Sequence, residues 1–307
     1  MIVLEKLSKS FGQFTAVDGI DLAVPKGEVL GFLGPNGAGK STTMKMISGF
    51  LEPSSGSARV AGFDIAQSPV EVKRRIGYMP EGAPSYGEMT AATFLSFVAE
   101  IRGFRGAEKN RRIDETVDRV RLAEVFHQPI DTLSKGFKRR VGLAQAMLHD
   151  PEVLILDEPT DGLDPNQKHH VRGLIKEMAR DKAIIISTHI LEEVEAVCSR
   201  AVIIAQGRLL ADGTPEELLA RDPHHQALVI TPVSGSEDQV RAALAAMGQI
   251  EAITGRDHQL RLTGASHKDV SAAIRDKNLQ IEELYVERGT LDDVFRQITA
   301  PRESAHA

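Results

Sequence analysis

The fold of this chain is decided by the stretch Gly34-Pro35-Asn36-Gly37-Ala38-Gly39-Lys40-Ser41-Thr42. Its spacing fits Gly-x-x-x-x-Gly-Lys-Ser/Thr, a phosphate-binding loop. Glycines let backbone N–H groups curl around phosphate oxygens, and the N-terminus of a following helix adds partial positive charge. Lys40 can then reach the β and γ phosphates of a nucleotide, and the Ser41 hydroxyl can ligate Mg²⁺.

The flanks of the loop agree with this interpretation. Residues 28–33 read as a buried strand, and residues 41–47 read as a helix that ends near Gly49. A plain glycine-rich turn is the alternative, but it does not require a strand before the loop and a helix after it. The sequence therefore predicts nucleotide binding by the whole stretch from Gly34 to Thr42.

Length and composition are those of an ordinary globular protein. The chain has 307 residues, 42% hydrophobic and 26% charged, which suits two unequal domains. The net charge of −6 argues against a dedicated nucleic-acid binder. One cysteine, Cys198, cannot form an internal disulfide, the N-terminus resembles no secretory signal, and the longest apolar runs are too short to span a bilayer. We expect a cytoplasmic protein, and any membrane process it serves would need another subunit to cross the membrane.

Short strands and helices alternate through the first 220 residues. Residues 1–24 suggest an antiparallel β element, residues 53–57 a plain loop, and residues 89–125 a helical insert that extends to about residue 145. Beyond the insert we expect an apolar helix at 141–148, buried strands at 153–157 and 183–187, and helices at 169–180 and 191–198. This alternation predicts a parallel sheet covered on both faces.

A composition shift at residues 221–225 separates a second region. Residues 226–299 follow a βαββαβ order, which predicts a small ferredoxin-like α+β domain. The strands are expected at 227–231, 250–254, 259–263 and 281–286, and the helices at 238–247 and 268–274. A loose dimerisation extension is the alternative, and residues 300–307 read as a frayed tail.

A second chemical motif is Val153-Leu154-Ile155-Leu156-Asp157-Glu158-Pro159. Asp157 ends a buried strand, where ligands gather in open α/β sheets. A carboxylate there can hold Mg²⁺, while Glu158 can polarise the water that attacks the γ phosphate. Two acids at a strand end could merely cap a loop, but the upstream phosphate loop favours the catalytic interpretation.

Two further stretches carry a resemblance to a known family. Leu133-Ser134-Lys135-Gly136-Phe137 precedes an apolar helix, and Ser187-Thr188-His189 ends a strand. With these residues, 1 to about 222 resemble an ATP-binding cassette (ABC) ATPase. The resemblance implies a P-loop NTPase fold of the α/β class, with an antiparallel β subdomain, a mainly parallel core sheet and a helical insert. It makes Asp157 and Glu158 the Walker B pair, residues 160–164 the D-loop with Asp164, and His189 the switch histidine.

The signature and one other position depart from the common spelling of this family. The signature is usually Leu-Ser-Gly-Gly-Gln, and here Lys135 and Phe137 replace a glycine and the glutamine. Glu81 stands where the family normally has glutamine, and its oxygen can still serve Mg²⁺ or the attacking water. Both variants, and the C-terminal domain ending near Phe295, are similar to exporter-type ATPases of the bacterial drug, polysaccharide and gliding-motility branch.

Three single residues have competing interpretations. The resemblance places Phe11 where an aromatic ring stacks on adenine and Val17 where an apolar residue packs beside it, although Phe11 could be a core aromatic. His189 follows a buried strand, which favours sensing of γ phosphate over an ordinary surface role. The basic run Lys135, Lys138, Arg139 and Arg140 could be a solvated face, but the resemblance makes it the start of the signature helix.

The resemblance also implies partners. ATP on one chain would be closed over by Ser134, Lys135 and Gly136 of a second copy or homologous cassette, in a head-to-tail dimer that holds two ATP. Residues 82–86 would dock a short helix of a polytopic permease on the inner face of the membrane. The leading hypothesis is the ATPase of an ABC exporter. A soluble ABC ATPase acting on ribosomes or DNA, and an importer ATPase, remain alternatives, and no nucleic acid is expected as a partner.

Overall fold

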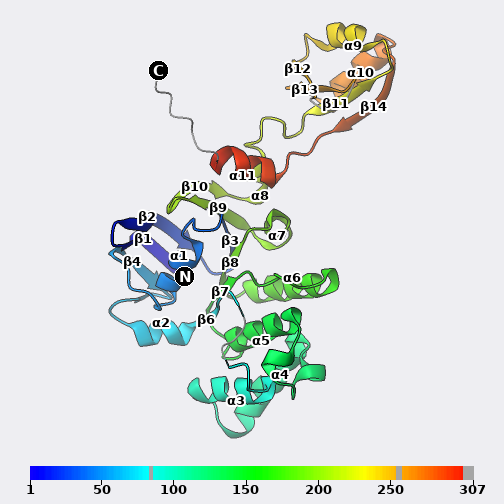
Figure 1. Ribbon diagram of the computed structural model, residues 1–307. Coiled ribbons are helices and arrows are strands. Elements are labelled where there is room, and N and C mark those ends of the chain that lie inside the picture. Colours follow the sequence, from blue (N-terminus) through cyan, green and yellow to red (C-terminus); the bar gives the residue numbers. More distant parts are fainter. Residues whose placement is uncertain (83–85, 254–257, 300–307) are drawn as a thin grey trace. The chain divides into compact units, whose positions relative to one another are not determined.

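The computed structural model describes residues 1–82, 86–253 and 258–299 (Figure 1). The chain divides into two compact units, Met1–Pro215 and Glu216–Ala307. The predicted tail at 300–307 and the predicted strand end at Thr254 lie outside the described residues.

Unit 1 contains two sheets. Its strands are β1 (Ile2–Phe11), β2 (Phe14–Val24), β3 (Val29–Leu33), β4 (Ser55–Val60), β5 (Phe63–Asp64), β6 (Ile76–Met79), β7 (Val153–Asp157), β8 (Ala183–Thr188), β9 (Arg200–Ala205) and β10 (Arg208–Gly213). Its helices are α1 (Lys40–Ile47), α2 (Pro69–Arg75), α3 (Ala91–Ile101), α4 (Gly106–Val120), α5 (Lys135–Met147), α6 (Pro165–Ala179) and α7 (Leu191–Val197), with 3₁₀ turns η1 (Ala123–Val125) and η2 (Ile130–Thr132); α8 (Pro215–Leu219) begins at the boundary of the units.

The central sheet places the predicted strands side by side. Its order is β10-β9-β3-β8-β7-β6, and the pairs from β9 to β6 are all parallel. Strands β3, β7 and β8 are buried along their whole length, as expected for a sheet with two covered faces. The prediction of a mainly parallel core sheet is confirmed. Because β3, β7 and β8 are parallel neighbours, the residues that follow them meet at one edge of the sheet.

The antiparallel sheet of unit 1 has the order β2-β1-β4-β5. The predicted β element beside the phosphate-loop strand is therefore confirmed. The interpretation of residues 53–57 as a plain loop was wrong in its second half, because β4 begins at Ser55 and pairs with β1. Gly56 and the two flanking serines gave a loop-like composition, and the pairing partner on β1 overrode it.

The helical region differs from the prediction at one boundary. Helices α3 and α4 occupy the expected insert, but α5 begins at Lys135 rather than Val141. The Ser134 hydroxyl accepts a hydrogen bond from the Phe137 N–H at 3.3 Å and caps the helix. The periodic apolar pattern starts later than the cap, so it missed the first six residues. Helices α2 and α6 also begin with proline residues that the pattern did not use as starts.

Unit 2 has the predicted βαββαβ order. Its elements are β11 (Leu228–Pro232), α9 (Glu237–Leu244), β12 (Gln249–Ala252), β13 (Leu260–Thr263), α10 (His267–Asp276), β14 (Ile281–Val286) and α11 (Leu291–Thr299). The sheet order is β12-β13-β11-β14, with every pair antiparallel. This is the ferredoxin-like arrangement. Its own apolar core includes Leu228, Val240, Leu262 and Val270.

Helix α11 was not predicted as a helix. The signal that could have found it is Thr290-x-x-Asp293. The Thr290 hydroxyl donates to the Asp293 carboxylate at 2.7 Å and accepts from the Asp293 N–H at 3.2 Å. This reciprocal capping resembles the capping box of a helix start.

Candidate functional site

The phosphate loop connects β3 to α1, and the backbone of β9 and β2 packs closely against its glycines. A Cβ on Gly34 would lie 2.4 Å from the Ile204 carbonyl oxygen. A Cβ on Gly39, whose φ is +107°, would lie 2.5 Å from the Ala16 carbonyl oxygen. Only glycine fits at either position, and Gly39 offers no side chain to cap the first turn of α1. The loop therefore leaves the N-terminal N–H groups of α1 to be satisfied by an anion.

Lys40 is the buried cation of this loop. Its Nζ donates to the Gly34 carbonyl at 2.7 Å and to the Pro35 carbonyl at 3.1 Å. Burial lowers the pKa of Lys40, while the charges of Glu158, Asp157 and Glu81 act to raise this pKa. The three predicted carboxylates therefore lie near enough to act electrostatically on the predicted phosphate-binding lysine.

Asp157 and Glu158 lie at the carboxyl end of β7. Asp157 is 3% exposed, and its Oδ1 accepts a short hydrogen bond from the Ser187 hydroxyl on β8. Glu158 adopts a left-handed backbone with φ +54°, and its N–H donates to the Ser187 carbonyl at 3.1 Å. A non-glycine residue in this conformation is strained, and such strain concentrates at functional sites.

His189 reaches the same carboxylate from the end of β8. Its Nδ1 lies 2.7 Å from Oε1 of Glu158. The imidazole is 57% exposed while the Glu158 side chain is 13% exposed. The pair therefore joins the loops after β7 and β8 and presents the histidine to solvent.

Glu81 follows β6 at the same sheet edge and is exposed. Its charge acts on Lys40 and on Tyr78, whose pKa burial raises to about 12 with smaller contributions from Asp157 and Glu81. We call the loop residues 34–42 together with Glu81, Asp157, Glu158 and His189 the phosphate-loop edge. Ser41 and Thr42 are half-buried in the first turn of α1.

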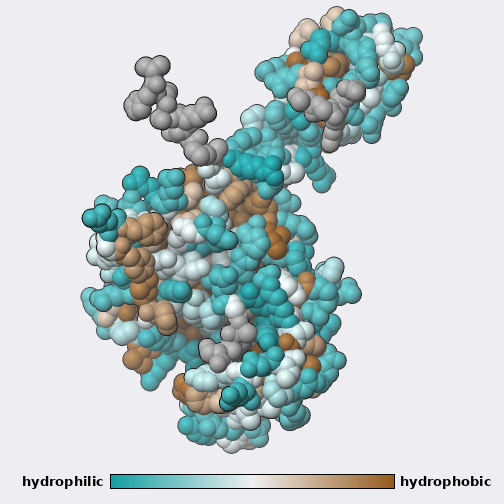
Figure 2. All heavy atoms as spheres, in the orientation of Figure 1, coloured by the Kyte–Doolittle hydropathy of each residue, from teal (hydrophilic) through white to brown (hydrophobic). Residues whose placement is uncertain are grey.

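Phe11 and Val17 have different environments. Phe11 is 50% exposed at the end of β1, opposite Phe14, which is 64% exposed, and Lys9 Nζ lies 5.3 Å from the Phe11 ring centre. Val17 is fully buried, and a Cβ on Gly39 would lie 3.3 Å from its Cγ2. Phe11 thus offers a free aromatic face, whereas Val17 supports the loop from beneath. Figure 2 shows apolar surface over the antiparallel sheet, where Phe11, Phe14 and Val3 are exposed.

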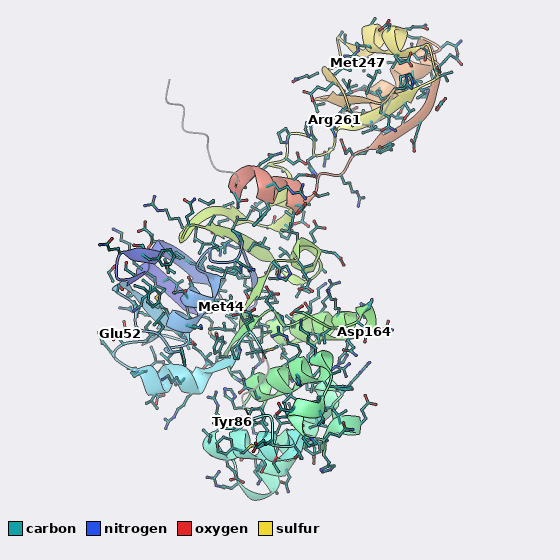
Figure 3. The ribbon with its side chains drawn as sticks, viewed as in Figure 1. Met44, Glu52, Tyr86, Asp164, Met247 and Arg261 are labelled. Carbon is teal, nitrogen blue, oxygen red and sulfur yellow. The ribbon has the colours of Figure 1, made fainter. Side chains whose placement is uncertain are left out.

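A second set of predicted residues lies on α5 and the loop before α6. Ser134 caps α5, and Asp164 caps α6 by accepting from the Gln167 N–H at 2.9 Å. Lys135 Nζ lies 2.8 Å from Asp161 of the same chain. We call residues 134–136 and 160–164 the signature edge. Figure 3 labels one residue near each edge. Met44 lies on α1, the helix that follows the phosphate loop, and Asp164 of the signature edge lies at the start of α6.

Two carboxylates that the sequence reasoning did not single out also act near the site. Asp161 pairs with Lys135 and Arg139. Glu193, on α7, is 5% exposed and accepts from the hydroxyls of Thr160 and Thr188, which follow β7 and end β8. Glu193 lies on α7, four residues after His189, which precedes that helix; this spacing alone does not distinguish Glu193 from a surface acid.

A groove of about 1050 Å³ lies beside the phosphate-loop edge. Its walls come from α2, β6, α3, the residues 102–104 that follow α3, and α5. They are mostly aromatic and aliphatic, with Lys73, Arg74 and Arg102 as cations. Tyr86, labelled in Figure 3, is 50% exposed and packs 6.0 Å from the Phe94 ring and 5.7 Å from the Phe97 ring. Residues 83–85 of the predicted docking stretch lie outside the described residues.

The site has the parts of one class of enzyme. A phosphate loop between β3 and α1, carboxylates after β7 and a histidine after β8, all on a parallel sheet, define a P-loop nucleoside triphosphatase. The sequence profile of the ABC transporter family matches residues 17–161. In the part of the chain that the structure describes, no helix is both long and apolar enough to cross a membrane.

Similar proteins define the family. The chain is 33% identical over 306 residues to the linearmycin resistance ATP-binding protein LnrL of Bacillus subtilis, covering 97% of this chain and 98% of that protein. It is 36% identical to the probable multidrug ABC transporter ATP-binding protein YbhF of Escherichia coli, covering 74% of this chain and 39% of that protein. A solved ATP-binding subunit of an ABC transporter, 32% identical, superposes with a TM-score of 0.67 over 72% of this chain and 92% of the other.

The chain therefore belongs to the ATP-binding proteins of ABC transporters and is an ATPase by family. The predictions of family, fold class and enzyme class are confirmed.

Proposed function

We propose that this chain is the ATP-hydrolysing subunit of an ABC exporter and acts at the inner face of the cell membrane through a separate permease. Residues 1–222 form the cassette and residues 226–299 an accessory domain. Similarity to LnrL over nearly the whole length supports the exporter assignment, because that relative is named for antibiotic resistance and its match includes unit 2. The observation that carries the ATPase mechanism is the meeting of Lys40, Asp157, Glu158, Glu81 and His189 at one sheet edge.

ATP binding rests on the loop and on Lys40. The N–H groups at the start of α1 donate hydrogen bonds to phosphate oxygens, and Lys40 exchanges its bonds to the Gly34 and Pro35 carbonyls for bonds to the β and γ phosphates. Phe11 stacks on the adenine with its exposed ring, while Val17 supports the loop. The remaining loop residues, Asn36, Gly37, Ala38, Ser41 and Thr42, surround the phosphates.

The donor set at this edge fits Mg²⁺. In residues 1–82, 86–253 and 258–299 no three His, Cys, Asp or Glu side chains form a complete metal cage. Mg²⁺ in phosphoryl transfer uses one or two carboxylates, a hydroxyl, water and substrate phosphates, so a cage is not required. Ser41, Asp157 and Glu81 supply these oxygens. When bound, Mg²⁺ neutralises charge on the β and γ phosphates.

Glu158 and His189 act on the attacking water. Glu158 accepts a hydrogen bond from the water, and this orients a lone pair of the water oxygen toward the γ phosphorus. His189, held through Nδ1 by Glu158, has its Nε2 side available to contact the γ phosphate. Positioning and charge neutralisation are the main contributions of a protein to phosphoryl transfer.

The other half of the site comes from a second copy or a homologous cassette. The signature of that chain closes over the γ phosphate with the Ser134 hydroxyl and the Gly136 backbone, with Asp164 in the adjoining loop, so that two ATP molecules join a head-to-tail dimer. The Ser134 hydroxyl accepts from the Phe137 N–H and keeps its own hydrogen for donation to phosphate. Hydrolysis then loosens the dimer.

The groove beside the phosphate-loop edge is the docking site for the permease. Its aromatic walls and its cations Lys73, Arg74 and Arg102 suit an amphipathic helix with an acidic residue. Gly82 lines this groove one residue after Glu81, so docking there acts directly on a site residue. The test is copurification of this chain with a polytopic membrane protein, which would support the proposal. Association with ribosomes or DNA instead would favour a soluble ABC ATPase.

Glu158→Gln tests the catalytic assignment. The amide keeps the size of the side chain but cannot polarise water as a carboxylate does, so we expect ATP binding to remain and hydrolysis to fall on the order of 100-fold or more. Steady-state phosphate release and equilibrium ATP binding measure the two effects. Normal turnover in this variant would remove Glu158 from the role.

A further inference from the structure

Asp161 lies where three separate segments of the cassette meet. Its Oδ2 is 2.8 Å from Lys135 Nζ and 3.3 Å from Arg139 Nη2, both on α5. The Nη1 of Arg139 donates to the Gly82 carbonyl at 3.4 Å. A single carboxylate in the loop before α6 is thus linked to the signature residues and to the strand end that lines the groove.

Steric contacts join the same segments. A Cβ on Gly162, whose φ is +74°, would lie 2.4 Å from Cδ of Lys135. The methylene chain of Lys135 therefore lies against the Gly162 backbone. A Cβ on Gly136 would lie 2.7 Å from Oε1 of Gln167 and 3.3 Å from Leu163. The two stretches of the signature edge therefore pack together, and a side chain at either glycine would displace a neighbouring side chain.

The two cations contribute differently. The Lys135 side chain is 63% exposed, and an exposed ion pair of this kind contributes little to the stability of the fold. The Arg139 side chain is 6% exposed, so loss of its carboxylate partner would leave a buried charge poorly compensated. Hydrogen bonding from Lys135, and then from Arg139, lowers the pKa of Asp161 and keeps this carboxyl ionised.

We propose that Asp161 is a positioning residue. It fixes Lys135 and, through Arg139, Gly82 relative to one another, and so orients Ser134 toward the nucleotide of the second chain. This inference rests on the proposed shared site. Lys135 then works inside its own chain, where its charge fixes the start of α5, instead of contacting phosphate. A permease helix that shifts Gly82 moves Arg139, and through Asp161 it moves the signature residues.

A double-mutant cycle on Lys135→Gln and Asp161→Asn tests this role. We expect each single variant to lower kcat about tenfold without changing ATP affinity, and the double variant to be no worse than the more affected single variant. Lys135→Arg keeps a cation over Gly162 and should retain most of the activity. Glu115→Gln removes an exposed ion pair of equal length on α4 and should leave kcat unchanged.

Two results would overturn the proposal. Additive effects, near 100-fold in the double variant, would mean that Lys135 acts independently of Asp161. Unchanged kcat in both single variants would mean that the ion pairs have no role in turnover. Thermal unfolding of each variant separates positioning from loss of fold. Asp161→Asn should lower Tm because buried Arg139 loses its carboxylate partner, whereas Lys135→Gln, at an exposed side chain, should leave Tm unchanged together with a reduced kcat.

The shared site itself is tested separately in the Glu158→Gln background. If that chain binds ATP without forming a dimer, the proposed shared site fails whatever the cycle gives. If it dimerises normally and the cycle is additive, only the role of Asp161 fails. Gly162→Ala provides a second probe, because its methyl group displaces the Lys135 stem and should reproduce the kcat of Lys135→Gln.

Discussion

The phosphate-loop edge and the signature edge of unit 1 pair their charges in different ways. At the phosphate-loop edge, buried Lys40 donates to backbone carbonyls, and carboxylates at the ends of β6 and β7 act on its charge. At the signature edge, Lys135 is exposed and is paired with Asp161. The first edge has a cation whose bonds a phosphate can replace, whereas the second has its charge already committed.

This difference explains how one chain can hold both parts of a divided site. The phosphate-loop edge contains the groups for binding and water activation, and Glu158 and His189 contact each other directly. The signature edge contributes shape, one hydroxyl and a rigid backbone, which serve only when presented to another nucleotide. Changes to the phosphate-binding residues of the first edge should therefore alter ATP binding by a single chain, and changes at the second edge should alter only association and turnover.

The largest expected effect is that of Lys40→Ala. Loss of a buried, charge-assisted donor to the phosphates should weaken ATP binding on the order of 100-fold. Calorimetric titration of the purified chain measures the affinity. Lys45→Ala, at an exposed position on the same helix, is the control and should bind ATP normally. Equal losses in the two variants would contradict the assignment of Lys40.

Much of this arrangement follows from the sequence. The phosphate loop, the Asp157-Glu158 pair and His189 each follow a short apolar strand, and parallel strands bring their carboxyl ends to one edge. The local sequence around each strand end therefore predicted which residues meet at this edge of the sheet. The βαββαβ order of unit 2 was also readable, because each strand and helix of the order has its own apolar periodicity.

The signature edge was less predictable. The substitution of Lys135 for the usual glycine was visible, but its partner Asp161 is 26 positions along the chain on a loop, and no periodicity relates the two. The Lys135 side chain fits against this loop because residue 162 is glycine. That contact forms only when α5 packs beside residues 160–164. The apolar pattern missed the start of α5, because that start depends on the Ser134 cap, whereas the family resemblance placed the start of this helix at Lys135.

An intermediate effect is expected at the far end of α5 from the signature edge. His149 donates through Nε2 to the Ile76 carbonyl, and burial lowers its pKa from 6.5 to about 4. The unfolded chain binds this proton below pH 6.5 while the folded chain stays neutral, so stability is complete above pH 6.5 and falls by about 3 kcal/mol as the pH drops to 4.

His149→Gln removes this titration while keeping a donor for the Ile76 carbonyl. Denaturant unfolding of the wild type and the variant between pH 4 and pH 8 measures the effect, and the variant should lose less stability on acidification. Identical slopes would contradict the assignment. Because His149 is part of neither edge, ATP affinity at pH 8 should be the same in both proteins.

The smallest expected effect is at Phe137. The Arg140 guanidinium lies 4.9 Å from the Phe137 ring centre, a contact worth about 0.5–1 kcal/mol. Phe137→Gln restores the usual signature spelling and should lower the free energy of unfolding by no more than this amount. Thermal unfolding and steady-state hydrolysis test it. A large loss of hydrolysis would show that the ring acts at the partner nucleotide and would weaken the contrast between the edges.

The division of one site between two chains is tested most directly by the mass of the Glu158→Gln protein with ATP. Light scattering should show an increase from the 33.4 kDa of one chain to twice that mass when ATP and Mg²⁺ are added. Adding Ser134→Asp keeps a good helix cap but places a negative charge against phosphate, so this double variant should bind ATP and remain at 33.4 kDa. A single-chain mass for Glu158→Gln with ATP bound, or a dimer that survives Ser134→Asp, would contradict the divided site.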